Sequence, residues 1–76
     1  MNQITNSEKL RFLIPHWIEH NQEHANEFRD WASRVGIARE DILKAAEHLE
    51  KASYALEAGL EKLGGPPAKE TQQNGI

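Results

Sequence analysis

The stretch WASRVGIAREDI, residues 31–42, decides the fold, because it separates two segments that share a helical pattern. Gly36 suits the left-handed backbone position that ends a helix, and Ile37 can fold back onto the last turn, as a Schellman ending prefers. Glu40 and Asp41 then favour the positively polarised start of another helix. The stretch therefore predicts a helix, a short turn and a second helix.

The first helix is expected over residues 7–35, where polar and apolar residues recur at helical spacing. Thr5 and Glu8 have the spacing of a capping box, and the two residues between them are alternative N-caps. Pro15 cannot donate a backbone hydrogen bond, and it disfavours helical geometry at the residue before it. We therefore expect the helix to be kinked at Pro15, or broken so that Pro15 begins the main helix.

The second helix is expected over residues 38–63. Gly64 and Gly65 stop it, and the two prolines that follow forbid its resumption. The last residues, AKETQQNGI, show no periodic apolar position before the final one. We predict a flexible N-terminus at residues 1–6, a helical hairpin domain at residues 7–65 and a disordered tail at residues 66–76.

The apolar residues of each helix recur alternately three and four positions apart, which is the spacing of a heptad seam. The first seam comprises Leu10, Ile14, Trp17, Asn21, His24, Phe28, Trp31 and Val35. The second comprises Ile42, Ala45, Leu49, Ala52, Leu56, Gly59 and Leu63. Two seams joined by a short turn predict an all-α antiparallel two-helix hairpin, in which Trp31 faces Ile42 and Asn21 faces Ala52.

In this register a second apolar surface lies beside the seam, and it comprises Ile18, Ala25, Ala46 and Leu60. Two helices alone cannot cover it, and a lone hairpin of this size buries too little apolar area to offset its chain entropy. We therefore predict a homodimer, most simply a four-helix bundle, and we expect the same surface to suit a protein partner. The alternative is a monomer with a docked N-terminal segment.

Composition narrows the classes of function. The 76 residues allow one small domain, and a net charge of -3 argues against nucleic acid as a partner. Without cysteine the chain has no disulfide, no thiolate zinc site and no cysteine nucleophile. The apolar run near the N-terminus is too short for a signal peptide or a membrane span, so we expect a cytoplasmic protein without a membrane partner.

Histidine is the compositional feature that points to chemistry, since three of the four histidines fall within nine residues. His16, His20 and His24 recur every four positions, so they climb one face of the first helix. Each of them is followed three positions later by a glutamate. A histidine pair at this spacing can chelate a metal ion from a single helix.

The predicted register also brings a histidine of the second helix beside this face. The predicted metal ligands are His20, His24, Glu27 and His48, with His16 and Glu23 as less favoured ligands. Three imidazoles and a carboxylate suit zinc, nickel, cobalt, copper or iron, whereas magnesium and calcium prefer oxygen ligands alone. We therefore expect a metal-binding protein without catalytic activity.

Two other interpretations stay open on the sequence alone. In the first, His24 and Asn21 form a polar layer that fixes the register, and the protein is a dimeric interaction module with structural or pH-responsive histidines. In the second, it is a small metal-dependent enzyme, which requires an open coordination position inside a substrate pocket. A hydrolytic triad is not predicted, because no serine has a histidine and an acid within the expected reach.

The segment LIPHWIEHNQEHANEF, residues 13–28, and the closing Leu63-Gly64-Gly65 resemble small uncharacterised prokaryotic helical-hairpin domains. The resemblance covers about residues 10–65 and implies a hairpin with a histidine and glutamate segment, but no established activity. The chain is also similar to ferritin-like and hemerythrin-like bundles, whose helices supply Glu and His to iron. It lacks their Glu-x-x-His pair on each of two helices, so oxygen-activating diiron chemistry is not expected.

Overall fold

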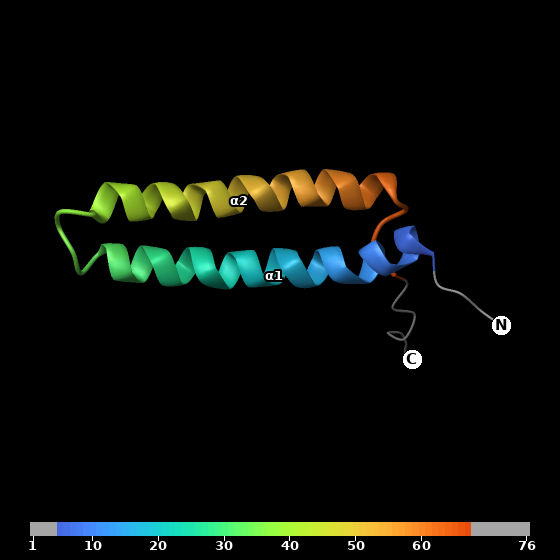
Figure 1. The fold of residues 1–76 in the computed structure, drawn as a ribbon, viewed down its shortest axis with the longest axis horizontal. Coiled ribbons are helices and arrows are strands. Elements are labelled where there is room, and N and C mark those ends of the chain that lie inside the picture. The colour runs from blue at the N-terminus through green and yellow to red at the C-terminus, as the bar shows by residue number, and fades with distance from the viewer. Residues whose placement is uncertain (1–4, 68–76) are drawn as a thin grey trace, which may run out of the picture.

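Two antiparallel α-helices make up the fold (Figure 1). The computed structural model describes residues 5–67, with α1 at Asn6–Ala32 and α2 at Arg39–Lys62. The helices lie side by side, so the expected all-α antiparallel hairpin is confirmed, and residues 5–67 contain no strand. No helix in this range is both long enough and apolar enough to cross a membrane. Most of the predicted flexible N-terminus, residues 1–4, and of the predicted tail, residues 68–76, lies outside the described residues.

The start of α1 follows the expected capping box. The Glu8 N–H donates to the Thr5 hydroxyl at 3.1 Å, and the Thr5 N–H donates to the Glu8 carboxylate at 3.1 Å. These two bonds satisfy donors that the first turn of a helix leaves without partners. The helix then continues without interruption through Pro15 to Ala32. A bend at Pro15 stays a prediction.

The turn between the helices differs from the expected one. Helix α1 ends at Ala32 instead of residue 35, with Ser33 as its C-cap. The Ser33 N–H donates to the Arg29 carbonyl at 3.2 Å, and its hydroxyl donates to the Asp30 carbonyl at 2.7 Å. The Ser33 hydroxyl thus takes the Asp30 carbonyl, and the Arg34 N–H donates to the Trp31 carbonyl instead, so the helical pattern of hydrogen bonds ends before the glycine. Gly36 has no positive φ and Ile37 is fully exposed, so the Schellman ending predicted for this turn is wrong.

A Schellman ending occurs instead at the end of α2. Gly64 and Gly65 have φ values of 109° and 83°, a region that favours glycine. The Gly65 N–H donates to the Leu60 carbonyl at 2.9 Å, and the Gly64 N–H donates to the Glu61 carbonyl at 3.1 Å. This is the pair of bonds that defines the motif. The predicted stop at these two glycines is therefore confirmed.

An arginine of α1 ties this ending to the other helix. The Arg11 guanidinium donates from Nε to the Gly65 carbonyl at 2.7 Å and from Nη2 to the Pro66 carbonyl at 3.3 Å. Both carbonyls lie just beyond the last turn of α2, where the backbone has no helical hydrogen-bond partner. The open end of the hairpin is thus closed by a side chain.

Three alanines and two larger aliphatic residues are buried in the contact between the helices. The buried residues are Ile14, Ala25 and Ala32 of α1 with Ala46 and Leu60 of α2. Across the contact, the Asn21 side-chain amide donates to the Ser53 hydroxyl at 3.3 Å. An ion pair of 2.6 Å joins Arg29 to Glu50. The register is therefore close to the expected one, with Asn21 opposite Ser53 instead of Ala52.

The rotation of each helix about its axis differs from the predicted one more than the register does. Ala25 and Ala46, which were expected on an open surface with Ile18 and Leu60, are fully buried in the contact, so that surface is not open to a partner. Trp17 and Trp31, expected in the seam, are largely exposed. Alanines at the contact let two backbones approach closely, whereas an indole between them would hold the helices apart. At the two tryptophans the predicted seam thus lies one residue away from the observed contact, whereas its members Ile14 and Asn21 lie within the contact.

Candidate metal-binding face

Three histidines form a ladder along the exposed side of α1, as their four-residue spacing predicts. The Nε2 atoms of His16 and His20 are 3.2 Å apart, and their ring centroids are 4.5 Å apart with the planes at 72°. The ring of His24 follows, with its centroid 6.4 Å from that of His20. The structure therefore brings His16 and His20 together more closely than either is brought to His24.

The separation of His16 and His20 fits two ligands of one metal ion. On a tetrahedral zinc with bonds of about 2.0–2.1 Å, two nitrogen ligands are about 3.3 Å apart. The observed Nε2–Nε2 distance of 3.2 Å is close to that value. Without a metal, the same two nitrogens can share one proton in a hydrogen bond. The separation of the two nitrogens is thus compatible with a shared proton or a shared metal ion.

Glutamates lie beside the other ring nitrogens of this ladder. The His20 Nδ1 is 4.0 Å from the Glu23 carboxylate, and the His24 Nδ1 is 3.2 Å from the Glu27 carboxylate. At 3.2 Å the Glu27 carboxylate can accept a proton held at His24 Nδ1, which leaves the Nε2 lone pair of that ring for a metal, an arrangement common around metal-bound histidines. The Glu23 carboxylate is too far from His20 for a hydrogen bond. All four side chains are more than half exposed, so water and metal ions reach them without any opening of the fold.

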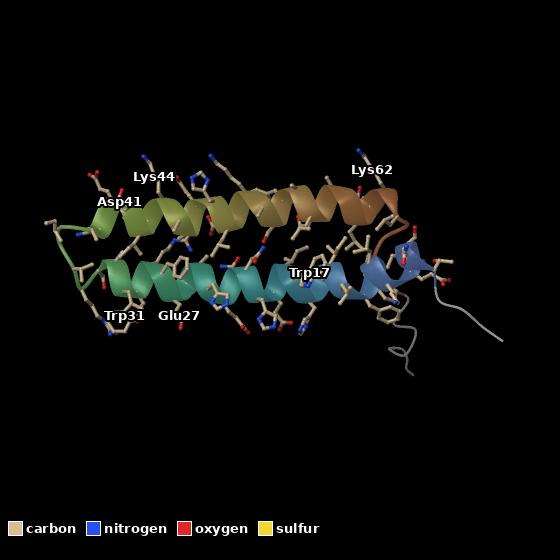
Figure 2. All side chains as sticks on the ribbon, viewed as in Figure 1. Trp17, Glu27, Trp31, Asp41, Lys44 and Lys62 are labelled. Atoms are coloured by element: carbon tan, nitrogen blue, oxygen red, sulfur yellow. The ribbon has the colours of Figure 1, made fainter. Side chains whose placement is uncertain are left out.

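The fourth predicted ligand, His48, lies on the other helix and is exposed. In Figure 2, Lys44 points away from α1, and His48 follows Lys44 by one helical turn and shares its side of α2. Glu27 points away from α2 in the same view. A single chain therefore does not gather His20, His24, Glu27 and His48 at one point. Within residues 5–67, no group of three or more His, Cys, Asp or Glu side chains has the geometry to hold a metal.

Sequence reasoning ranked His16 below the other histidines, because its register position points outward. In the structure its Nε2 atom lies 3.2 Å from that of His20, so these two rings are the closest pair of the ladder. The signal was present in the sequence as the four-residue spacing from His20. It was outweighed by the predicted convergence of the two helices, which depended on the rotation of α1.

A shallow hollow lies away from the ladder, beside the end of α2. It is lined by Tyr54, Glu57, Ala58, Leu60, Glu61, Gly65 and Pro66. None of the histidines lines it. The ladder itself is a convex, solvated surface of a helix.

Comparisons with known proteins place the chain in a family. Residues 10–64 match the family described as "Domain of unknown function (DUF8180)". An "Uncharacterized protein" of Archaeoglobus fulgidus is 33% identical over 61 residues, which cover 75% of this chain and 98% of the relative. No solved structure matches the chain. The protein therefore belongs to the family described as Domain of unknown function (DUF8180).

Proposed function

We propose that this protein binds a transition metal ion, without catalysis, through the histidine ladder of α1. The observation that carries the proposal is the 3.2 Å separation of the His16 and His20 Nε2 atoms. The Glu23 carboxylate, 4.0 Å from the opposite nitrogen of His20, supports it by placing a negative charge near the pair. As the sequence predicts, we place this activity in the cytoplasm.

The chemistry of the pair limits the metal and its affinity. Imidazole suits zinc, copper, nickel, cobalt and iron, and affinity in this series is expected to be highest for copper. Two imidazoles fill two positions of a tetrahedral centre, and water or an exposed carboxylate fills the others. Binding weaker than the roughly 10 kcal/mol of a structural zinc site is therefore expected, with a Kd in the micromolar range or above. Such a site exchanges its metal readily.

The test is a titration of chelator-treated protein with zinc, nickel and copper near neutral pH, followed by calorimetry and by NMR of the histidine rings. We expect one metal per ladder, with the ring signals of His16 and His20 shifting together. The double variant His16→Ala/His20→Ala should abolish saturable binding. His48→Ala is the matched control, because it removes an exposed histidine from the other helix.

Two outcomes would redirect the proposal. Saturable binding that is lost equally in His48→Ala and in His20→Ala would favour the cross-helix ligand set predicted from the sequence. That set requires ligands from a second chain or a rotation of α1. No saturable binding up to about 1 mM metal, a concentration well above the expected Kd, would reject metal binding altogether.

A second candidate function is a dimeric interaction module in which the histidines are structural or pH-responsive. It is favoured by the exposed Trp17 and Trp31, which are costly to leave in water. Such a module keeps its association behaviour in chelator, whereas a metal-dependent assembly loses it.

We also propose that α1 bends at Pro15, because Pro15 leaves the carbonyl of Arg11 without its helical donor.

A further inference from the structure

We infer that one long side of the hairpin binds the same side of a second copy of this chain, forming a four-helix bundle. The side is defined by two rows of residues. The aromatic row, on α1, comprises Leu13, Trp17, His24 and Trp31. The small row, on α2, comprises Ala45, Ala52 and Gly59.

Helix geometry places both rows on the same side of the hairpin. Every member of the aromatic row immediately precedes a buried or half-buried residue of the contact, as Trp31 precedes Ala32. Every member of the small row does the same on α2, as Ala45 precedes Ala46. A step back of one residue turns the same way about each helix axis. The two helices face each other and run in opposite directions. The residues that precede the contact residues therefore lie on the same side of the plane that contains both helix axes.

Apart from His24, the residues of this side are apolar, and they are incompletely covered. Leu13, Trp17 and Trp31 are 41%, 41% and 54% exposed. Five more apolar side chains lie between the rows and the contact and are only half-buried: Leu10, Phe28, Leu49, Leu56 and Leu63. Although 28% of the chain is Asp, Glu, Lys or Arg, no such residue belongs to either row. A surface without charge over most of two helices is unlike one that faces water.

The two rows are complementary in shape. Indole and leucine side chains form a ridge on α1, and alanine and glycine leave a shallow trough on α2. A Cβ atom added at Gly59 would meet nothing within 4 Å, so the trough is open above that residue. In a twofold symmetric pair, the ridge of each chain can fill the trough of the other, because the same surface serves both partners.

The size of the side and the weakness of the single core favour a second copy as the occupant. Helices of this length, about 36 Å, lying about 10 Å apart, offer roughly 700 Å² per chain, near the 800 Å² of a stable interface. No large side chain is fully buried in the single hairpin, as far as residues 5–67 show. A second copy is always present where the chain is made.

The test measures the mass of the full chain by sedimentation and light scattering in chelator, so that the result does not depend on the proposed metal site. We expect about twice 8.6 kDa for the wild type. Ala52→Arg places a charge in the small row at an exposed helical position, which a lone hairpin tolerates. It should weaken self-association by about tenfold or more. The matched control is Ala55→Arg, an exposed alanine of α2 outside the row, which should leave the association constant unchanged.

Tryptophan fluorescence gives a second readout, because both tryptophans of the chain lie in the aromatic row. Their emission should shift to the blue as the protein is concentrated, in the wild type and in Ala55→Arg but not in Ala52→Arg. A helical wild type that stays monomeric at about 100 μM would overturn the inference, since an interface of this area should have a dissociation constant below that concentration. A dimer that Ala52→Arg and Ala55→Arg affect equally would also overturn it.

Discussion

Glycine follows a helix at both ends of the hairpin, yet only after α2 does it adopt the left-handed backbone conformation that ends a helix. After α2, Gly64 and Gly65 adopt positive φ values and donate to carbonyls of the last turn. After α1, Gly36 does neither, and Ser33 ends the helix three residues earlier. The difference lies in what surrounds each ending: Arg11 donates to the carbonyls of Gly65 and Pro66 and lies 3.6 Å from the position of a Gly64 Cβ, whereas a Cβ at Gly36 would meet nothing within 4 Å. Glycine permits a left-handed ending, and a serine upstream can make it unnecessary.

The largest effect is expected where the glycines are used. The double variant Gly64→Ala/Gly65→Ala forces two Cβ atoms into a left-handed backbone, which costs about 1–2 kcal/mol per residue. We expect a loss of about 2–4 kcal/mol in the free energy of unfolding, measured by denaturation with circular dichroism at fixed protein concentration. A loss under about 0.5 kcal/mol would mean that the ending rearranges without strain.

An intermediate effect is expected at the arginine that closes the open end. Arg11→Met keeps much of the aliphatic stem but removes both hydrogen bonds to the residues after α2. Stability should fall by about 1 kcal/mol, the typical value of such bonds. Arg39→Met is the matched control near the turn, because Arg39 is exposed and its guanidinium makes no hydrogen bond or ion pair with other residues of the range 5–67, so the change should cost less than about 0.5 kcal/mol. Equal losses in the two variants would show that the two ends do not differ in this respect.

The smallest effect, and one of opposite sign, is expected at the unused glycine. Gly36 has an ordinary φ, and a Cβ atom there would meet nothing within 4 Å. Gly36→Ala should therefore raise the free energy of unfolding by about 0.4–1 kcal/mol, because it lowers the entropy of the unfolded chain. A destabilised Gly36→Ala protein would indicate a left-handed Gly36 in solution, and the sequence-based expectation would then be right.

Much of the fold could be predicted from local sequence. The capping box at Thr5 and the stop at Gly64 and Gly65 were predicted because each depends on residues within a few positions of one another. The rotation of the helices could not be predicted, because α1 carries two neighbouring apolar stripes. One contains the small Ala25 and Ala32, the other Trp17 and Trp31, and periodicity does not say which stripe meets the other helix.

The candidate site shows the same division. The pairing of His16 with His20 follows from spacing along one helix. The predicted meeting of Glu27 with His48 depended on how both helices rotate, and in the structure Glu27 pairs with His24 of its own helix instead. Contacts within a helix are fixed by 3.6 residues per turn, while contacts between helices also depend on which side chains fit between the backbones.

The bond from Arg11 to Gly65 joins residues 54 positions apart, nearly the whole length of the hairpin. Closing so long a loop costs more chain entropy than forming the turn, so we expect the turn to form first and the Arg11 contact last. Unfolding should follow the reverse order and begin with loss of the Arg11 contact. Backbone amides near Arg11 and Leu60 should then exchange with solvent as one cooperative group. Helical amides beside the turn, at residues 29–32 and 43–46, that lose protection before this group would contradict the order.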